Sequence, residues 1–478
     1  MSVSTLRETE DVFRAFEATA AVRGSEAALL HNGDVVTYQS LAERVAMTAS
    51  LYRRDFAEQG SPRPAGVVVS HAPAAVEHLL GALAAGAPYC PIDAALPAAR
   101  RQQLAEAFGS ADIGGSAAYV LCTSGSTGAP KPVVVSRQAL SVTVRALVDL
   151  FELTPDDRVL QFASLSWDTC FEEMLPALTC GATVVFDCEA HSGSMPRFLR
   201  MVHEREITVL DLPTAFWHEL VLYLKDEQTG LPDTLRLVII GGERVDPTRL
   251  QQWRSMATGG ITLLNTYGCT ETTMITHAVR LSGPGTEPEI EAQQGETPLG
   301  RRLPHVVDHI SDEGELLIAG PGLATGYLGF AELTEAAFPV VAHGCEPTRW
   351  FHTGDLVTGS AGGLLYPRGR VDEQVKVLGV RVHPAEVETQ LTTHPAVAGA
   401  VVVGTRSLGR TTLTAYVVPA LAVSAAELKR YLRARLPGQF VPSRINFVAA
   451  LSYTSSGKVD RVATQCAAAD LENKGTVQ

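Results

Sequence analysis

The sequence lacks the features that mark membrane, secreted and nucleic-acid-binding proteins. No apolar run approaches the roughly 20 residues that a membrane-spanning helix needs. The opening MSVSTLRETEDVFRAF has no basic segment followed by an apolar one, as a signal peptide would. The 39 basic residues are outnumbered by 52 acidic ones, and the formal charge of -13 repels nucleic acid. We therefore expect a cytoplasmic protein with no membrane or nucleic-acid partner.

Cysteine pairs, repeats and low-complexity linkers are also missing. The eight cysteines include no Cys-x-x-Cys pair, which favours reduced, structural thiols. Apolar residues make up 46% of the chain and charged residues 19%, the balance of a folded globular protein. The 478 residues exceed the roughly 150 of a typical domain, so the sequence predicts several lobes around more than one core.

The apolar pattern indicates an α/β fold class. Short runs rich in Val, Ile and Leu alternate with helical patterns, as in buried parallel strands joined by crossover helices. From about residue 290, Gly/Pro-punctuated strands indicate a β-rich subdomain, and strands and helices alternate after Asp372. We predict a large N-terminal domain, residues 1–371, of mixed and parallel sheets flanked by helices, and a small α+β C-terminal domain, residues 372–478. The expected parallel strands are AGVVVSH, AAYVLCTSG, RVLQFAS, ATVVFD, ITVLDLP, LRLVIIGGE and ITLLNTYG.

A loop rich in glycine and hydroxyl groups follows the strand AAYVLC. Its backbone N–H groups and side-chain donors suit the phosphates of a nucleotide. It is not a Walker loop, because Lys131 is followed by Pro132 and Val133 and not by Ser or Thr. Taken alone, it could be a surface turn. The loop comprises Thr123, Ser124, Gly125, Ser126, Thr127, Gly128, Ala129, Pro130 and Lys131.

Five further motifs follow along the chain. Together with the loop they resemble, in order and approximate spacing, the adenylation domains of nonribosomal peptide synthetases, within the acyl-adenylate-forming superfamily. The resemblance runs from about residue 25 to 465. The motifs are Gly241-Gly242-Glu243, Asn265-Thr266-Tyr267-Gly268-Cys269-Thr270-Glu271, His352-Thr353-Gly354-Asp355, Gly369-Arg370-Val371-Asp372 and Ser456-Gly457-Lys458-Val459-Asp460-Arg461.

The resemblance implies a binding site for ATP and Mg²⁺. Tyr267 would stack on adenine, and Asp355 and Arg370 would bind the ribose. Glu271 would be the magnesium carboxylate, since Mg²⁺ prefers oxygen ligands, and Thr270 a hydroxyl beside the phosphates. Singly, each residue has an ordinary alternative as a turn former, core residue or solvated charge. The remaining ATP-binding residues would be the triphosphate loop Thr123 to Gly128 with Lys131, and Gly241, Gly242, Glu243 and Gly268.

The same resemblance implies roles for Lys458 and Asp372. The substrate carboxylate is itself the nucleophile, so catalysis consists of bringing two anions together and stabilising charge on the α-phosphate. Lys458 would do this by bridging both groups. Asp372 would be the hinge about which a mobile C-terminal domain rotates between adenylation and thioester formation. The alternatives are an exposed loop lysine and a linker aspartate.

The acyl pocket is the most informative part of the resemblance. Asp168 aligns with the aspartate that pairs with a substrate ammonium, and in a helix Glu172 would lie on the same face one turn later. The mapped pocket holds three acids, which repel one another unless cations compensate them. We therefore predict a basic amino acid. The residue set resembles pockets associated with β-lysine, which is therefore favoured over lysine, ornithine and arginine-like residues. The other mapped positions are Thr169, Asp211, Ile239, Gly241, Thr266, Met274 and Ile275, with Lys458 completing the set.

Ordinary explanations of these acids stay open. Glu172 and Glu173 could complement a helix dipole, and Asp211 could cap the helix LPTAFWHEL. Two departures from the family, Pro132 and Cys269, lie beside expected nucleotide contacts. The stretch from Pro91 to Tyr119 is also shorter than in relatives.

The expected activity is formation of an aminoacyl-AMP with release of pyrophosphate, followed by transfer to the phosphopantetheine thiol of a peptidyl carrier protein. No attachment motif for phosphopantetheine follows Arg461, so we expect the carrier outside this sequence. A small MbtH-like activator protein is a further expected partner. The alternatives are an acyl-CoA ligase that uses coenzyme A and a catalytically inactive nucleotide-binding protein.

Overall fold

The computed structural model describes residues 11–59, 66–109, 111, 113, 116–124, 129–291, 295–343, 346–407, 410–452, 460–461 and 463–468. The chain divides into two compact units. The larger comprises Met1–Ala94, Ala105–Cys122 and Pro132–Val371, and the smaller Ala95–Leu104, Thr123–Lys131 and Asp372–Gln478. The sequence-based prediction had placed the segments Ala95–Leu104 and Thr123–Lys131 in the large domain, residues 1–371.

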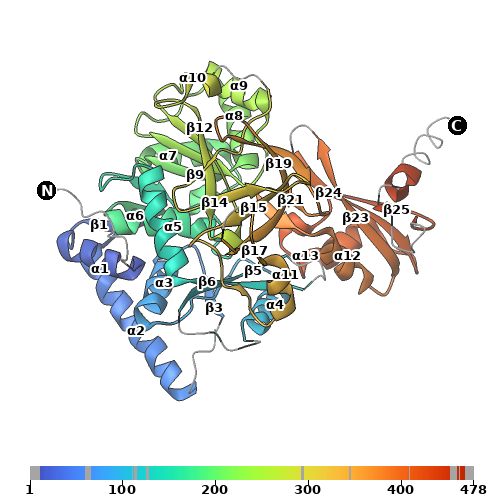
Figure 1. Cartoon of the computed structure of the whole chain (residues 1–478), viewed down its shortest axis with the longest axis horizontal. Coiled ribbons are helices and arrows are strands. Elements are labelled where there is room, and N and C mark those ends of the chain that lie inside the picture. Colours follow the sequence, from blue (N-terminus) through green and yellow to red (C-terminus); the bar gives the residue numbers. More distant parts are fainter. Residues whose placement is uncertain are drawn as a thin grey trace. The chain divides into compact units, whose positions relative to one another are not determined.

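A twisted sheet runs through the larger unit (Figure 1). Its strand order in the described chain is β13-β12-β11-β10-β9-β7-β8-β1-β2. The strands from β11 to β1 in this order run parallel to one another, and β12 and β2 pair antiparallel at the two ends of this group. The runs of Val, Ile and Leu form these parallel strands because both faces of the sheet are buried. The strands are β1 (Ala27–His31), β2 (Asp34–Thr37), β7 (Arg158–Leu160), β8 (Thr183–Phe186), β9 (Val209–Pro213), β10 (Leu237–Gly241), β11 (Thr262–Gly268), β12 (Ile275–Ser282) and β13 (Arg301–Arg302).

Two of the predicted strands lie outside this sheet. β3 (Val67–Val69) pairs in parallel with β4 (Pro91–Asp93), and β5 (Ala117–Thr123) belongs to a sheet with β6 (Lys131–Ser136) and β16 (Gly326–Tyr327). The predicted β-rich part is a sheet of order β14-β15-β19-β20 and the pair β17-β18. These strands are β14 (Val307–Ile310), β15 (Glu315–Ala319), β17 (Val340–Val341), β18 (Thr348–Arg349), β19 (Phe351–Gly359) and β20 (Leu365–Arg370).

Helices accompany these sheets along the chain. Among the described residues, no helix combines the length and apolar character required to cross a membrane. The helices are α1 (Val12–Val22), α2 (Tyr38–Gln59), α3 (Pro73–Ala85), α4 (Ala98–Phe108), α5 (Arg137–Leu150), α6 (Thr169–Cys180), α7 (Met195–Glu204), α8 (Thr214–Asp226), α9 (Pro247–Ser255), α10 (Pro288–Glu291) and α11 (Ala331–Ala337), with 3₁₀ turns η1 (Cys188–His191) and η2 (Thr270–Thr272).

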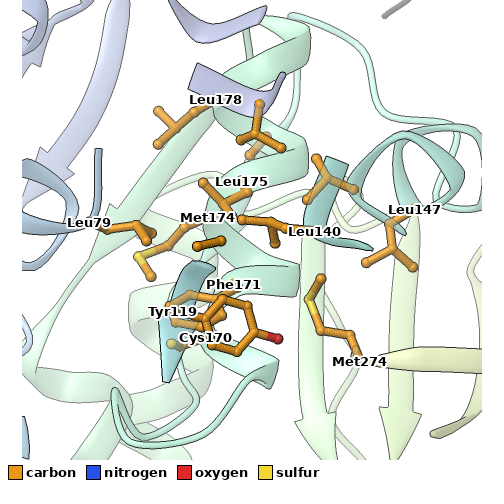
Figure 2. Packing of buried hydrophobic residues seen from close by; sticks show 14 of the residues in the cluster. Leu79, Tyr119, Leu140, Leu147, Cys170, Phe171, Met174, Leu175, Leu178 and Met274 are labelled. Atoms are coloured by element: carbon orange, nitrogen blue, oxygen red, sulfur yellow. The ribbon is translucent and has the colours of Figure 1, made fainter. Parts of the chain in front are cut away.

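Helix α6 forms the centre of the largest hydrophobic core. Every residue from Cys170 to Cys180 is buried, as expected of a helix enclosed by other elements. Figure 2 shows Phe171, Met174 and Leu175 of this helix packed among leucines of α3 and α5, with Tyr119 of β5 nearby. Because α6 is enclosed on all sides, the acids near its N-terminus are held in a rigid, water-poor environment.

The smaller unit combines strands and helices. β21 (Val375–Val377) and β22 (Val380–Val382) form a hairpin, and β23 (Val397–Ser407), β24 (Arg410–Pro419) and β25 (Arg444–Phe447) form a sheet. With them lie α12 (Pro384–Thr392), α13 (Ala425–Arg433) and the 3₁₀ turn η3 (Gly438–Phe440). A buried ion pair of 2.7 Å joins Arg100 Nη1 to Glu386 Oε1 within this unit. The α/β fold class predicted from the sequence is confirmed.

Candidate active site

Asp168 occupies the N-cap position of α6, yet its side chain caps no helix N–H group. The Thr270 side chain and the Met274 backbone lie close to its carboxylate and favour its ionised form. Burial and the nearby charge of Glu271 raise the pKa of Asp168 to about 6. Asp168 Oδ2 is buried and has no hydrogen-bond partner among the described residues. Asp168 therefore has an acceptor left for a ligand, and Thr270, expected beside the phosphates, contacts this carboxylate.

Glu172 and Asp211 meet in the same pocket. Glu172 lies one turn beyond Asp168 on α6, and Asp211 lies on β9, next to Ile239 of β10. Their carboxyl groups lie close enough for their charges to interact. Burial raises the pKa of both groups, that of Asp211 to about 7. The helix-cap alternative for Asp211 is wrong, because α8 starts at Thr214 with Pro213 in the N-cap position.

Glu173 has a different role from Glu172. Glu173 Oε1 accepts hydrogen bonds from the backbone N–H groups of Phe162 and Ala163, both at 2.9 Å, and Oε2 accepts one from Gln161 Nε2 at 3.0 Å. These three donors fix the segment that follows β7. Glu173 is therefore held by the protein itself.

Among the residues that the structure describes, no basic side chain compensates the acids of this pocket. Within the part of the chain that the structure describes, no Lys, Arg or His forms an ion pair with Asp168, Glu172, Glu173 or Asp211. Several buried carboxyl groups without a cation are costly, because each charged form loses its hydration. The described residues therefore leave the charge of these acids uncompensated.

The other mapped pocket residues surround these acids on neighbouring elements. Thr169 begins α6, Ile239 and Gly241 lie on β10, and Thr266 lies beside Gly241 on β11. Thr266 Oγ1 donates to the Ile240 carbonyl at 3.1 Å. Met274 and Ile275 are buried where β12 begins.

Tyr119 of β5 is a pocket residue that the sequence reasoning missed. Its hydroxyl is buried and has no hydrogen-bond partner among the described residues. Burial and the charges of Asp168 and Glu172 raise its pKa well above the ordinary value. Figure 2 shows the ring beside Phe171 with its hydroxyl on the side of Met274. The only sequence signal was a hydroxyl-bearing residue within an otherwise apolar strand.

The turn from η2 into β12 has an unusual backbone. Thr273 and Met274 have φ values of 58° and 67°, in the left-handed region that favours glycine. Such residues cost on the order of 1–3 kcal/mol each and persist where the surroundings fix them. A Cβ atom at Gly268 would lie 1.8 Å from the Met274 carbonyl oxygen. Gly268 is therefore needed for the close approach of this turn.

Tyr267, Asp355 and Arg370 come together at the expected nucleotide end. Asp355 on β19 pairs directly with Arg370 on β20. The Tyr267 hydroxyl donates to Asp355 Oδ2 at 2.7 Å, and Arg370 Nη1 donates to Asp355 Oδ1 at 2.5 Å. Unlike the pocket acids, this carboxylate has a cation beside it.

The backbone at Gly241 and Gly242 is tightly constrained. A Cβ atom at Gly241 would lie 2.6 Å from Thr266 Oγ1. Gly242 has a φ of 85°, which side chains rarely adopt, and Glu243 follows in the same loop. The two glycines therefore allow a close packing of β10 on β11 and a left-handed turn after it.

Glu271 is buried, and its Oε1 accepts a hydrogen bond from the Tyr327 hydroxyl at 3.0 Å. In the described parts of the chain, no three His, Cys, Asp or Glu side chains lie together as metal ligands. Glu271 and Asp168 are nonetheless close enough for their charges to interact. The Glu271 carboxylate is a ligand type that fits a hard divalent cation whose other ligands are substrate oxygens and water.

The phosphate-loop prediction falls partly outside the described residues, which exclude Gly125, Ser126, Thr127 and Gly128. Thr123 ends β5 with its hydroxyl buried and without a partner among the described residues. Ser124 Oγ donates to the Arg381 carbonyl at 2.9 Å, and Lys131 begins β6.

Lys458 lies outside the described residues. Three residues later, Arg461 forms ion pairs with Glu373 at 2.6 Å and Glu388 at 2.8 Å. Asp372 is the first residue of its segment in the smaller unit, and its Oδ1 accepts a hydrogen bond from the Gln374 N–H at 3.2 Å. Arg461 is thus bound to Glu373, the residue that follows Asp372 in the sequence.

Comparison with known proteins gives a consistent assignment. The AMP-binding enzyme family matches residues 114–328, and the AMP-binding enzyme C-terminal domain matches residues 386–458. The chain is 37% identical, over 95% of its length, to an isonitrile lipopeptide synthase of Streptomyces coeruleorubidus. It is 35% identical, over 84% of its length, to a probable non-canonical nonribosomal peptide synthetase, CymA, of Salinispora arenicola. It spans 33% and 5% of these two relatives.

A solved structure shares the fold. The artificially fused adenylation and carrier-protein di-domain NpsA-ThdA from Klebsiella oxytoca superposes with a TM-score of 0.78 over 93% of this chain and 94% of that chain, at 21% identity. The sequence matches and the shared fold lead to one conclusion: the chain belongs to the AMP-binding enzymes, as an adenylation domain of the kind found in nonribosomal peptide synthetases.

Proposed function

We propose that this adenylation domain activates a basic amino acid with ATP and passes the aminoacyl group to a carrier-protein thiol. The observation that carries the proposal is the acidic pocket. Glu172 and Asp211 are buried and Asp168 is half-buried, and no cation among the described residues forms an ion pair with them. A substrate with two positive groups compensates all three acids, with one ammonium at Asp168 and the other at Glu172 and Asp211. β-Lysine is the first candidate, followed by lysine, ornithine and arginine-like amino acids.

The other end of the site serves the nucleotide. Asp355 accepts hydrogen bonds from the ribose hydroxyls, and Arg370 orients this carboxylate. Tyr267 faces adenine, while its hydroxyl stays bound to Asp355. Glu271 holds Mg²⁺, which neutralises phosphate charge when bound. The loop residues Thr123, Ser124 and Lys131 bind the triphosphate.

Lys458 joins the two ends of the site during the reaction. The substrate carboxylate attacks the α-phosphorus of ATP, a C–O–P linkage forms, and pyrophosphate leaves with the electrons of the broken P–O bond. Lys458 stabilises this meeting of anions by its positive charge. No general base is required, because the attacking carboxylate is already ionised.

The second half-reaction needs a carrier protein. The thiol of its phosphopantetheine arm attacks the acyl carbon and releases AMP, with Asp372 as the hinge of the small domain. NpsA-ThdA combines an adenylation domain with a carrier protein, which supports this partner. An MbtH-like activator protein is a further proposed partner, testable by coexpression.

A pyrophosphate exchange assay across amino acids tests the proposal. β-Lysine, lysine, ornithine and arginine are expected to exchange faster than norleucine, leucine and phenylalanine. Faster exchange with an apolar amino acid would contradict the basic substrate, and no exchange with any acid would favour the inactive nucleotide-binding alternative. Offering coenzyme A and a holo-carrier protein as acceptors separates an acyl-CoA ligase from a carrier-loading enzyme.

A further inference from the structure

The segment between β7 and α6, residues 161–168, ends with Asp168. It forms neither a helix nor a strand along its length. Asp168 Oδ2 is buried and has no hydrogen-bond partner among the described residues. The position of this oxygen therefore depends on the contacts that hold the backbone of the β7–α6 segment.

The first half of the β7–α6 segment is bound to α6. Glu173 Oε1 accepts hydrogen bonds from the N–H groups of Phe162 and Ala163, both at 2.9 Å. Glu173 Oε2 accepts one from Gln161 Nε2 at 3.0 Å, and Gln161 Oε1 accepts one from His71 Nδ1 at 2.6 Å. Glu173 and Gln161 are both buried, so little water competes for these bonds.

The second half of the segment is bound to β4, a strand of another sheet. Asp93 of β4 is buried, and its Oδ2 accepts a hydrogen bond from Ser164 Oγ at 2.7 Å. The Asp93 N–H donates to Ser166 Oγ at 3.1 Å. His71 Nε2 lies 3.9 Å from Asp93 Oδ2. Two buried carboxylates, Asp93 and Glu173, thus hold the segment from two different elements.

A hydrogen-bonded turn connects Ser164 to Asp168. The Trp167 N–H donates to the Ser164 carbonyl at 3.1 Å, and Asp168 is the next residue. The Asp168 carbonyl accepts a hydrogen bond from the Phe171 N–H at 2.8 Å, in the first turn of α6. A displacement of Ser164 is therefore transmitted to Asp168 through a short, bonded stretch of backbone. The expected ribose contact, Asp355, lies on a different element, β19.

We propose that Asp93 is a positioning residue for the amino acid: through Ser164 it holds the β7–α6 segment so that Asp168 meets the substrate ammonium. The inference rests on the proposed role of Asp168. Asp93 does not touch the substrate in this mechanism and acts through Asp168 alone. A misplacement of about 1 Å at a binding group can cost about 100-fold in rate, so the loss of this contact is measurable in the kinetics.

Pyrophosphate exchange tests the inference, with the amino acid that exchanges fastest as substrate. Ser164→Ala removes the donor to Asp93. We expect kcat/KM for the amino acid to fall by about tenfold, chiefly through its KM, while the KM for ATP stays the same. Ser164→Thr keeps the hydroxyl and should restore most of the loss. An unchanged KM for the amino acid in Ser164→Ala, or an equal rise in the KM for ATP, would overturn the inference.

Thr208→Ala is the matched control. Thr208 Oγ1 donates to Asp157 Oδ1 at 2.7 Å, a bond of the same kind and length as that between Ser164 and Asp93. Asp157 immediately precedes β7, whereas the β7–α6 segment follows this strand. Thermal unfolding shows whether each variant is folded, and Asp93→Ala replaces Ser164→Ala if the latter is not. A loss of kcat/KM for the amino acid as large in the control would show a general structural effect and overturn the inference.

A double variant tests whether Ser164 and Asp93 act through Asp168. Adding Ser164→Ala to Asp168→Asn should lower kcat/KM by less than about twofold, because the charge that is being positioned is already absent. A further tenfold loss would overturn the inference. Fastest exchange with an apolar amino acid would contradict the basic substrate and leave this test in place, since such an amino acid carries the same ammonium. No exchange with any amino acid would contradict both the proposed function and the inference.

Discussion

The carboxylates at the two ends of the site differ in what compensates their charge. At the nucleotide end, Asp355 has Arg370 and the Tyr267 hydroxyl within hydrogen-bond distance. At the acyl end, Glu172 and Asp211 have each other and no cation among the described residues. The protein therefore pairs the carboxylate with a cation where, in our proposal, the ligand is a neutral sugar. It leaves the balance open where, in our proposal, the ligand is positive.

Replacement of Lys458 is expected to have the largest effect, because this residue would join the two ends. Lys458→Ala should lower the adenylation rate by about 100-fold or more, since charge stabilisation in the transition state is lost. The KM values for ATP and amino acid should change little. The exposed Lys225→Ala serves as the control. A rate equal to that of the control would remove Lys458 from the mechanism.

Replacement of Asp168 is expected to weaken amino acid binding without affecting ATP binding. Asp168→Asn removes the charge that pairs with the first ammonium, so kcat/KM for a basic amino acid should fall by about 100-fold. The KM for ATP should stay the same in pyrophosphate exchange. The exposed Asp149→Asn is the control. A rise in the KM for ATP of similar size would mean that Asp168 acts at the nucleotide end.

Replacement of Asp355 is expected to weaken ATP binding without affecting the choice of amino acid. Asp355→Asn weakens the acceptor for the ribose and leaves Arg370 without its partner, so the KM for ATP should rise by about tenfold. The ranking of amino acids should remain unchanged. A variant that binds ATP normally but changes substrate preference would reverse the proposed assignment of the two ends.

The smallest expected effect is on stability and has opposite signs at the two ends. The folded pKa of Asp211, about 7, lies above the ordinary value of 3.8. The folded state therefore binds more protons between these values, and the stability that this group contributes is lost as pH rises toward 7. Asp211→Asn removes the penalty and should raise the Tm at about pH 8 by a few degrees. Asp355→Asn should lower the Tm at that pH, and thermal scans of both variants without ligand are the measurement.

The sequence predicted the features that depend on local pattern. The apolar runs form strands at the expected places, and the helical period brings Glu172 one turn beyond Asp168. The order of motifs gave the family, which the comparisons confirm. The assignment of β3 and β5 to other sheets could not be predicted, because strand pairing depends on contacts between distant segments.

The contacts within the site also depend on packing between segments that are distant in the sequence. Nothing local brings Glu172 against Asp211 or Asp355 against Arg370, since each pair is joined by packing or strand register. The grouping of residues 95–104 and 123–131 with the smaller unit has the same origin. Helical spacing from Asp168 distinguishes Glu172 from Glu173, but only the three N–H donors to Glu173 reveal its structural role.

The left-handed backbone of Thr273 and Met274 limits how this domain can be re-engineered for other amino acids. Libraries that randomise position 274 will enrich Gly and Asn for conformational reasons unrelated to the side chain that the new substrate needs. Ile239 lies in a regular strand and Thr169 at the start of a helix, so these positions accept varied side chains without that bias. Changes of specificity should therefore be sought first at the latter two positions.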